Sequence, residues 1–227
     1  MTKVLILVEG QTEEEFIRQL VYDYLWPKNV FIQPKSIPTR RVVSGPDYKG
    51  GLRSYPKING EIRRLLGDSS ASAVTMMYDY YGLPTDFPGR RNLKGKDGFQ
   101  KVRILEAALA RDINDPRFIP YIQLHEFEGL LFSSPVLMAD TILRLGTEAQ
   151  RRKLAAELQT IRKGFRTPED IDDNPEKHPS KRIAGLAARY QKVKHGILIA
   201  KGIGIEKIRE QCPHFNEWLT RLEKLSQ

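Results

Sequence analysis

Residues 4–16, VLILVEGQTEEEF, decide the fold predicted for this chain. The apolar run VLILV has the length and composition of a buried strand, and it ends at a carboxylate, Glu9. Gly10 and Gln11 predict a turn, and Thr12 with Glu15 forms the capping-box pattern that begins a helix. A strand, an acid, a turn and a helix are the start of an α/β unit, and ligands gather at the carboxyl ends of such strands.

The rest of the first half of the chain repeats this alternation. Strands are predicted at residues 3–9, 30–37, 73–78 and 118–124, and helices at residues 12–26, 55–66 and 98–111. Such alternation predicts a mostly parallel sheet flanked by helices. Beyond residue 134 the pattern is helical, so we expect an α/β core over residues 1–133 and a helical C-terminal region over residues 134–227 that packs on it. The Gly-, Pro- and Arg-rich stretch 38–54 predicts a long loop, which is often functional.

Composition narrows the class of protein. A chain of 227 residues can bury one good core. No apolar run approaches the roughly 20 residues of a membrane span, and Glu9 interrupts the one candidate for a leader segment. The single cysteine, Cys212, excludes an internal disulfide and a cysteine metal cluster. We therefore expect a cytoplasmic protein that does not act in a membrane.

Charge is strongly segregated along the chain, which has a net charge of +9 and a pI near 9.6. Basic residues dominate 35–64 and 89–103, whereas acids gather at 9–15, 79–86 and 126–128. Acidic islands between basic loops suit metal-assisted chemistry on a phosphodiester, because carboxylates hold cations and basic side chains hold the phosphate backbone. The alternative is a basic protein whose charge runs are simply solvated.

Three predicted strands end in carboxylates: Glu9, Asp79, and the pair Glu126 and Glu128. Parallel strands share one carboxyl edge, so these acids are expected to converge there, where a divalent cation relieves their repulsion. We predict Glu9, Asp79 and Glu126 or Glu128 as ligands of Mg²⁺ or Mn²⁺, with Glu9 and Asp79 catalytic. In the alternative, Glu9 only accepts hydrogen bonds from the backbone of the next helix.

Two further acids are secondary candidates for this site. Glu13 lies in the first turn of the first predicted helix, where an acid also suits the helix dipole. Asp86 lies in the loop YYGLPTDFPG, residues 80–89.

Basic and polar side chains supply the candidates for phosphate binding. From the two basic stretches, the candidates are Arg40, Arg41, Arg90 and Arg91. In the later segment HPSKR, Ser180 is predicted to cap a helix whose free amides suit an anion, with Lys181 and Arg182 beside it. The alternative for this segment is an ordinary capped helix with solvated basic residues.

Several motifs together resemble one known family. VEGQTEEEF, MYDYYGLP followed by DFPG, LHEFEGLLF, HPSKRI and the ending C-P-x-F-x-x-W are similar to the DUF4276 family of bacterial proteins. That family is of uncharacterised function and is regarded as related to the TOPRIM fold. TOPRIM domains occur in topoisomerases, primases and overcoming-lysogenization-defect nucleases, where acids after the strands bind Mg²⁺ to cut or join phosphodiesters. The resemblance implies a TOPRIM/Rossmann-like parallel sheet.

By position, the resemblance implies roles for particular residues. Glu9 matches the first TOPRIM glutamate, and Asp79 matches the first acid of the Asp-x-Asp motif. The second acid of that motif is replaced by Tyr81. The candidates to supply the missing carboxylate are Asp86, Glu126 or Glu128.

Two hypotheses about function follow. The first is a Mg²⁺-dependent nuclease or other phosphodiester-acting enzyme on DNA or RNA; the resemblance implies a phage-defence effector beside an ATPase of the ABC or SMC type. The second is a non-catalytic nucleic-acid- or protein-binding subunit that works with such an ATPase, which Tyr81 favours. A haloacid-dehalogenase-like phosphatase is disfavoured because Glu9 stands where that chemistry needs an aspartate. A P-loop NTPase is disfavoured because no G-x-x-x-x-G-K-[ST] pattern occurs.

Overall fold

A parallel sheet organises the N-terminal half of the protein. The computed structural model describes residues 1–36, 54–172 and 177–226. The strands of the sheet are β1 (Thr2–Val8), β2 (Val30–Ser36), β3 (Ala73–Asp79), β4 (Phe118–Ile119) and β5 (Ile122–Gln123). They lie in the order β2-β1-β3-β4, with β5 also paired to β3, and every pair is parallel. The predicted parallel α/β fold is therefore confirmed.

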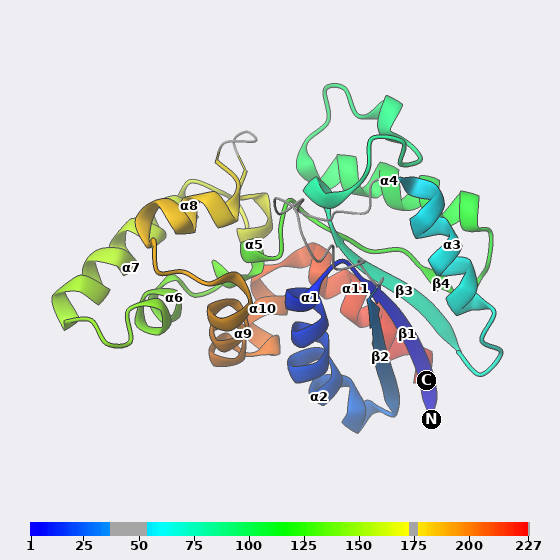
Figure 1. The fold of residues 1–227 in the computed structure, drawn as a ribbon, viewed down its shortest axis with the longest axis horizontal. Coiled ribbons are helices and arrows are strands. Elements are labelled where there is room, and N and C mark those ends of the chain that lie inside the picture. The colour runs from blue at the N-terminus through cyan, green and yellow to red at the C-terminus, as the bar shows by residue number, and fades with distance from the viewer. Residues whose placement is uncertain (37–53, 173–176, 227) are drawn as a thin grey trace, which may run out of the picture.

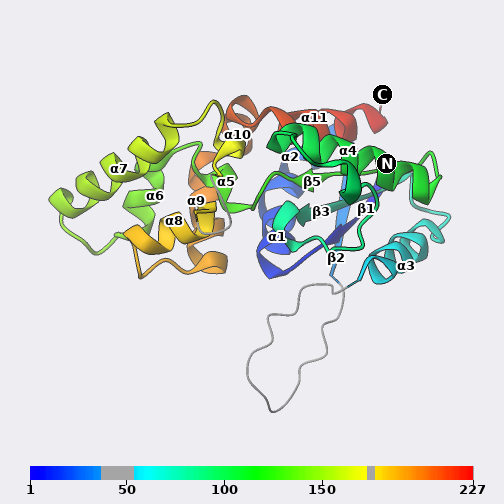
Figure 2. The same ribbon diagram turned by 90° about the horizontal axis from the view of Figure 1, so that it is seen from above.

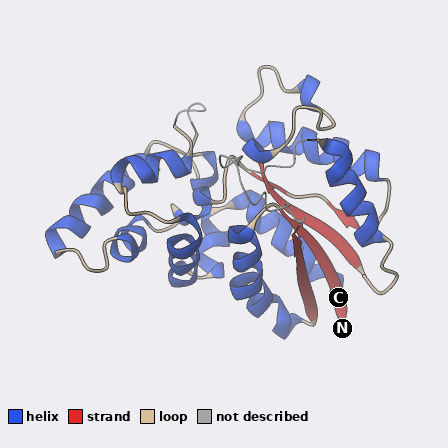
Figure 3. Ribbon diagram, viewed as in Figure 1, coloured by secondary structure: helices blue, strands red, loops and turns tan. Residues whose placement is uncertain are grey.

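Helices make up most of the rest of the described chain (Figure 3). The α-helices are α1 (Gln11–Phe16), α2 (Tyr22–Leu25), α3 (Tyr55–Leu66), α4 (Gly98–Ile113), α5 (Glu128–Leu131), α6 (Pro135–Ile142), α7 (Glu148–Lys163), α8 (Pro179–Leu186), α9 (Lys192–Ile203), α10 (Ile205–Gln211) and α11 (Pro213–Glu223). A π-helical turn, Ile17–Val21, joins α1 to α2. Short 3₁₀ turns follow α2 (Trp26–Lys28), β3 (Tyr80–Gly82) and α11 (Lys224–Ser226), and others lie at Arg90–Asn92 and Pro168–Asp170.

Two local expectations need correction. The first helix begins at Gln11 with Gly10 as its N-cap and has no side-chain cap, so the capping box assigned to Thr12 and Glu15 is wrong. Thr12 is instead buried inside the first turn. The strand predicted at 118–124 is split into β4 and β5, because Pro120 between them has no N–H to donate to the ladder.

Alternating residues of β1 face two separate apolar layers. Val4, Ile6 and Val8 pack with the layer that contains α1, α2 and α11. Leu5 and Leu7 pack with the layer that contains α3 and α4. This period of two is the expected geometry of a strand buried on both faces. Figure 1 shows α3 and α4 on one side of the sheet and α1 and α2 on the other.

The helices α6 to α9 form a lobe beside the sheet, and α5 lies between the two (Figure 2). The apolar cluster of β1 continues through α5 into this lobe and returns through α11. Helix α11 lies against the sheet, where the indole N–H of Trp218 donates to Thr75 Oγ1 at 2.9 Å. The division at residue 133 stays a prediction, and one buried cluster spans it. Among the described residues, no helix combines the length and the apolarity needed to cross a bilayer.

Candidate active site

The ends of β1 and β3 place two predicted acids side by side. Val8 pairs with Met77, so Glu9 and Asp79 leave the sheet at the same carboxyl edge. A carboxylate oxygen of Glu9, Oε2, accepts a hydrogen bond from the backbone N–H of Asp79 at 3.1 Å. Glu9 does not cap its own following helix, whose N-cap makes no side-chain hydrogen bond. The expectation that strand-end acids share one edge is met for this pair.

A third acid, Glu128, joins them through a lysine. Lys192 Nζ, at the start of α9, lies 3.2 Å from Glu128 Oε2 and 3.7 Å from Asp79 Oδ2. Asp79 Oδ1 accepts the backbone N–H of Phe127 at 2.8 Å, which fixes the chain just before α5. Glu128 is fully buried, and neither of its oxygens accepts a hydrogen bond from the described residues. We call Glu9, Glu13, Asp79 and Glu128 the acidic cluster.

Burial dominates the electrostatics of the acidic cluster. Desolvation and the nearby Glu13 carboxylate raise the pKa of Glu9 to about 7. Burial also raises the pKa of Asp79 and of Glu128 above the usual range, and Lys192 offsets only part of this. Burial alone would lower the pKa of Lys192, but the carboxylates of Asp79 and Glu128 hold it above its ordinary value. Near neutral pH, Glu9 therefore changes between its protonated and ionised forms.

A glycine makes room for the Glu9 carboxylate. Gly82 ends the 3₁₀ turn that follows β3. A Cβ at this position would collide with both carboxylate oxygens of Glu9. The backbone approaches this carboxylate as closely as only glycine allows, so the turn forms one wall of the acidic cluster.

Glu126 lies in a different environment from Glu128. Its Oε2 accepts the backbone N–H of Ser180 at 2.8 Å, and its Oε1 lies 3.1 Å from Ser180 Oγ and 3.0 Å from His178 Nδ1. The N-cap of α8 is His178, followed by Pro179, so the prediction that Ser180 is the N-cap is wrong. Proline suits this first helical position because its ring fixes φ and no N–H is needed there. Glu126 itself is the anion at the start of α8.

The two secondary acids, Glu13 and Asp86, also lie in different environments. Glu13 is buried in α1, and its charge acts on both Glu9 and Asp79. Asp86 accepts the backbone N–H of Tyr55 at 2.9 Å and so holds the start of α3. The structure brings Glu13 into the acidic cluster and places Asp86 at a helix start.

Tyr81, at the position of the expected second acid, lies among imidazoles. Its ring centroid is 5.7 Å from that of His125 and 5.5 Å from that of His178. His125 has a left-handed backbone, with φ of 57°, and its Nδ1 lies 3.3 Å from Asp172 Oδ2. Burial and the Asp172 carboxylate raise the pKa of Tyr81. A half-exposed phenol with a neutral hydroxyl thus replaces the carboxylate that the motif would supply.

The predicted phosphate-binding residues that the structure describes have varied surroundings, and phosphate binding by them stays a prediction. Arg90 donates from Nε and Nη2 to the carbonyls of Pro84 and Leu83, at 2.8 and 2.6 Å, and so braces the loop after β3. Arg91 and Lys181 are exposed. Arg182 donates to the carbonyl of Lys177 and covers the ring of Phe165. Arg40 and Arg41 lie outside the described residues.

The donors of the acidic cluster are hard carboxylate oxygens, the ligands that Mg²⁺ and Mn²⁺ prefer. In the part of the chain that the structure describes, no three or more His, Cys, Asp or Glu side chains form a ready metal-binding group. The donor chemistry fits a hard cation, since Glu128 is buried with two oxygens that accept no hydrogen bond. Lys192 brings a positive charge into the cluster, and the sequence analysis did not single it out for this site.

The fold and the cluster together define an α/β protein with buried acids at the carboxyl edge of its sheet. The model of the family described as "Domain of unknown function (DUF4276)" matches residues 8–223, and the chain belongs to this family. No curated protein matches the chain. The C-terminal region of the Burkholderia pseudomallei OLD protein is 14% identical, with 100% of each chain covered and a TM-score of 0.48. The C-terminal region of the Xanthomonas campestris pv. campestris OLD protein is 15% identical, with 100% of this chain and 97% of that chain covered and a TM-score of 0.47.

Proposed function

We propose that the protein is a Mg²⁺-dependent nuclease, or a related phosphodiester-acting enzyme, whose centre is the acidic cluster. The observation that carries this proposal is the convergence of Glu9, Asp79 and Glu128 around the Lys192 ammonium at the sheet edge. Buried acids with perturbed pKa values and a specific charged partner are typical of active sites. The net charge of +9 of the whole chain suits a polyanionic substrate.

Four residues, Glu9, Lys192, Asp79 and Glu128, have separate roles in the proposed hydrolysis. In hydrolysis a water oxygen attacks phosphorus, the ester P–O bond breaks, and the departing oxygen takes up a proton. Glu9, with a pKa of about 7, is suited to accept the proton of the attacking water. Lys192 is suited to stabilise negative charge on the phosphoryl oxygens. Asp79 and Glu128, with Glu9, would hold the Mg²⁺, which when bound would neutralise charge and lower the pKa of water.

Cleavage of labelled DNA and RNA strands with Mg²⁺ or Mn²⁺ tests this proposal. Glu9→Gln and Asp79→Asn are each expected to lower the cleavage rate by about 10²-fold or more, because each removes a carboxylate of the centre. Glu210→Gln, which alters an exposed acid on α10, is the matched control and should leave the rate unchanged. Equal rates for all four proteins would exclude the acidic cluster from catalysis.

Two observations favour a second candidate, a non-catalytic nucleic-acid- or protein-binding subunit that works with an ATPase. Lys192 already compensates Asp79 and Glu128, and Tyr81 supplies no carboxylate. Calorimetric titration separates the candidates: no heat with millimolar Mg²⁺ or Mn²⁺, together with salt-sensitive binding of nucleic acid, would support the binding subunit. An ABC- or SMC-type ATPase partner, a role in phage defence and a cytoplasmic location are proposed on the family resemblance and the composition.

A further inference from the structure

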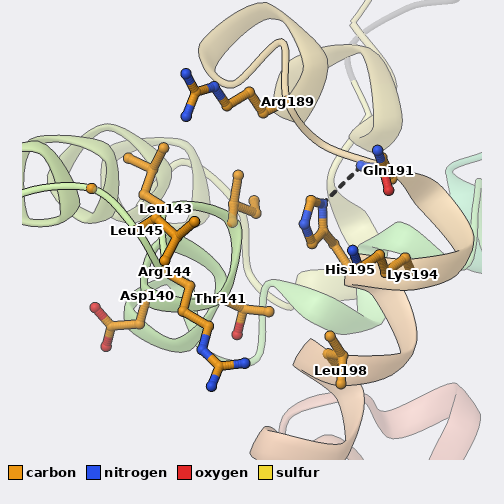
Figure 4. A pocket seen from close by; sticks show the side chains of 12 residues that line it. Asp140, Thr141, Leu143, Arg144, Leu145, Arg189, Gln191, Lys194, His195 and Leu198 are labelled. Atoms are coloured by element: carbon orange, nitrogen blue, oxygen red, sulfur yellow. Dashed lines mark hydrogen bonds between the residues drawn. The ribbon is translucent and has the colours of Figure 1, made fainter.

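A cavity of about 680 Å³ opens between α6 and α9 on the helical lobe. One wall is formed by the end of α6 and the turn before α7, and the other by the first half of α9 with the segment before it (Figure 4). The side chains that decide its chemistry are Leu145, Arg144, Arg189, Lys194, His195 and Leu198. Its volume lies in the range of small-ligand sites.

The charge of the cavity is positive and uncompensated. Arg144, Arg189 and Lys194 line it, and none of them pairs with a carboxylate among the residues that the structure describes. The acid on its wall, Asp140, lies 3.6 Å from Arg151 Nε and is therefore already partly neutralised. Three cations around one opening, with a single paired acid, favour an anionic occupant.

His195 adds a neutral donor to the same wall. Its Nδ1 accepts the backbone N–H of Gln191 at 2.9 Å (Figure 4). Burial and the adjacent Lys194 lower the pKa of His195, so its ring is neutral at pH 7. With Nδ1 acting as an acceptor, the ring proton is on Nε2, which can donate to an oxygen or a base edge.

The rim of the cavity is apolar and held in place. Leu145 is 97% exposed and Leu198 is 50% exposed, so both present apolar surface to solvent at the rim. The turn that carries Leu145 is fixed, because Gly146 N donates to Leu143 O at 2.7 Å and Arg151 Nη1 donates to Gly146 O at 2.6 Å. A rigid apolar rim beside cations suits a flat base joined to phosphate.

We propose that this cavity binds an unpaired nucleotide of a single-stranded nucleic acid, next to the phosphate that reaches the acidic cluster. Lys192 of the cluster and His195 of the cavity lie three residues apart on α9, about 4.5 Å along its axis. One strand can therefore reach both. A duplex keeps its bases stacked inside, so a cavity of this kind selects unpaired bases. This proposal depends on the proposed function only in placing the scissile phosphate at the acidic cluster.

Fluorescence anisotropy with labelled single strands of about 12 nucleotides, of DNA and of RNA, measures the binding directly. Chelator replaces divalent metal, so cleavage cannot interfere. Arg144→Gln/Arg189→Gln is expected to weaken binding by about tenfold at low salt, because two phosphate contacts are lost. The control Arg111→Gln/Arg221→Gln removes the same charge from exposed positions on α4 and α11, and should change affinity by less than about twofold.

Photocrosslinking of the wild-type protein to a strand that carries 5-iodouracil provides a measurement that needs no variant. Crosslinks at residues 143–146 or 189–198 are expected. Equal affinities of the two double variants, crosslinks confined to other elements, or equally tight binding of a duplex would overturn the proposal. If the strand binds in this cavity but the protein cleaves no nucleic acid, the proposed function fails and the nucleotide-binding proposal stands. If the protein cleaves nucleic acid but the two double variants bind the strand equally, the nucleotide-binding proposal fails and the proposed function stands.

Discussion

Among the described residues, buried acids lie in the acidic cluster and around His214, which Glu106 and Glu169 both contact, and the two groups differ in how their oxygens are bonded. At the start of α11, Glu169 accepts the backbone N–H groups of His214 and Phe215, at 2.9 and 3.0 Å. In the acidic cluster, Glu128 is as deeply buried, yet it faces one ion pair, with Lys192 Nζ 3.2 Å from its Oε2, in place of the two backbone donors that Glu169 has. A buried carboxylate bound by two backbone donors holds structure, whereas one paired with a side chain can exchange that partner for a ligand.

The pKa alone does not separate the two places. Burial raises the pKa of Glu9 to about 7 and, at the other place, raises the pKa of Glu169 to about 7 as well. The neighbours of the two carboxylates differ. The pKa of Glu169 is lowered in part by His214 and by two backbone N–H groups, whereas Glu9 faces the Glu13 carboxylate and accepts one N–H group, that of Asp79. A perturbed pKa therefore becomes evidence of function only together with unsatisfied geometry.

The largest expected effect comes from removing the cation of the acidic cluster. Lys192→Met should lower the cleavage rate by about 100-fold, because a charge that stabilises the phosphoryl oxygens is lost. Lys201→Met is the control, at the other end of α9, where the ammonium contacts Gln19. Rates are compared under single-turnover conditions with Mg²⁺. A rate for Lys192→Met equal to that of the control would assign Lys192 a purely structural role.

A matched pair of substitutions tests the contrast between saturated and open carboxylates. Glu169→Gln should lower the free energy of unfolding by about 2 kcal/mol, because one amide oxygen replaces two carboxylate oxygens for two N–H donors. Glu128→Gln should change it by less than about 1 kcal/mol, because the ion pair lost with Lys192 is offset by removal of a buried charge that repels Asp79. Urea unfolding of both variants measures the difference. Equal losses of unfolding free energy would show that Glu128 and Glu169 contribute equally to stability.

Adding one methyl group tests the wall of the acidic cluster. Gly82→Ala should lower the cleavage rate by about tenfold, because the new Cβ displaces the Glu9 carboxylate. Gly60→Ala on α3, where a Cβ meets open space, is the control and should leave the rate unchanged. An active Gly82→Ala variant would show that the position of Glu9 does not matter.

The pH dependence of stability tests the raised pKa of Glu9 itself. Unfolded Glu9 loses its proton near pH 4.5, whereas folded Glu9 keeps it to about pH 7. The unfolded state binds fewer protons in this window, so stability falls as the pH rises from about 4.5 to 7, by at most about 1.4 kcal/mol per pH unit per group. Urea unfolding across this range should show a shallower fall for Glu9→Gln than for wild type. Parallel curves would mean that the pKa of Glu9 is not raised.

Much of the fold follows from local sequence patterns. The run VLILV forms β1, and the alternation of strands and helices gives the parallel sheet, because periodicity and strand-end position are local properties. The split at Pro120 and the start of the first helix at Gly10 were missed, since a proline within an apolar run and an uncapped helix start are weak signals.

The site depends more on tertiary packing. Glu9 and Asp79 were expected to lie together, and they do, because parallel strands share an edge. Glu126 and Glu128, two residues apart, contact different partners because α5 begins at Glu128: Glu126 binds the start of α8, and Glu128 pairs with Lys192. Lys192 arrives from a helix more than 60 residues further along the chain, and no local pattern in the sequence encodes that contact.

The central claim is that the acidic cluster holds a catalytic divalent cation. A structure of crystals soaked in Mn²⁺, with anomalous scattering to locate the metal, tests it most directly. We expect manganese bound by Glu9, Asp79 and Glu128, with none on Glu126, which is occupied by Ser180 and His178. A cluster without manganese, in which Lys192 still pairs with Asp79 and Glu128, would contradict it.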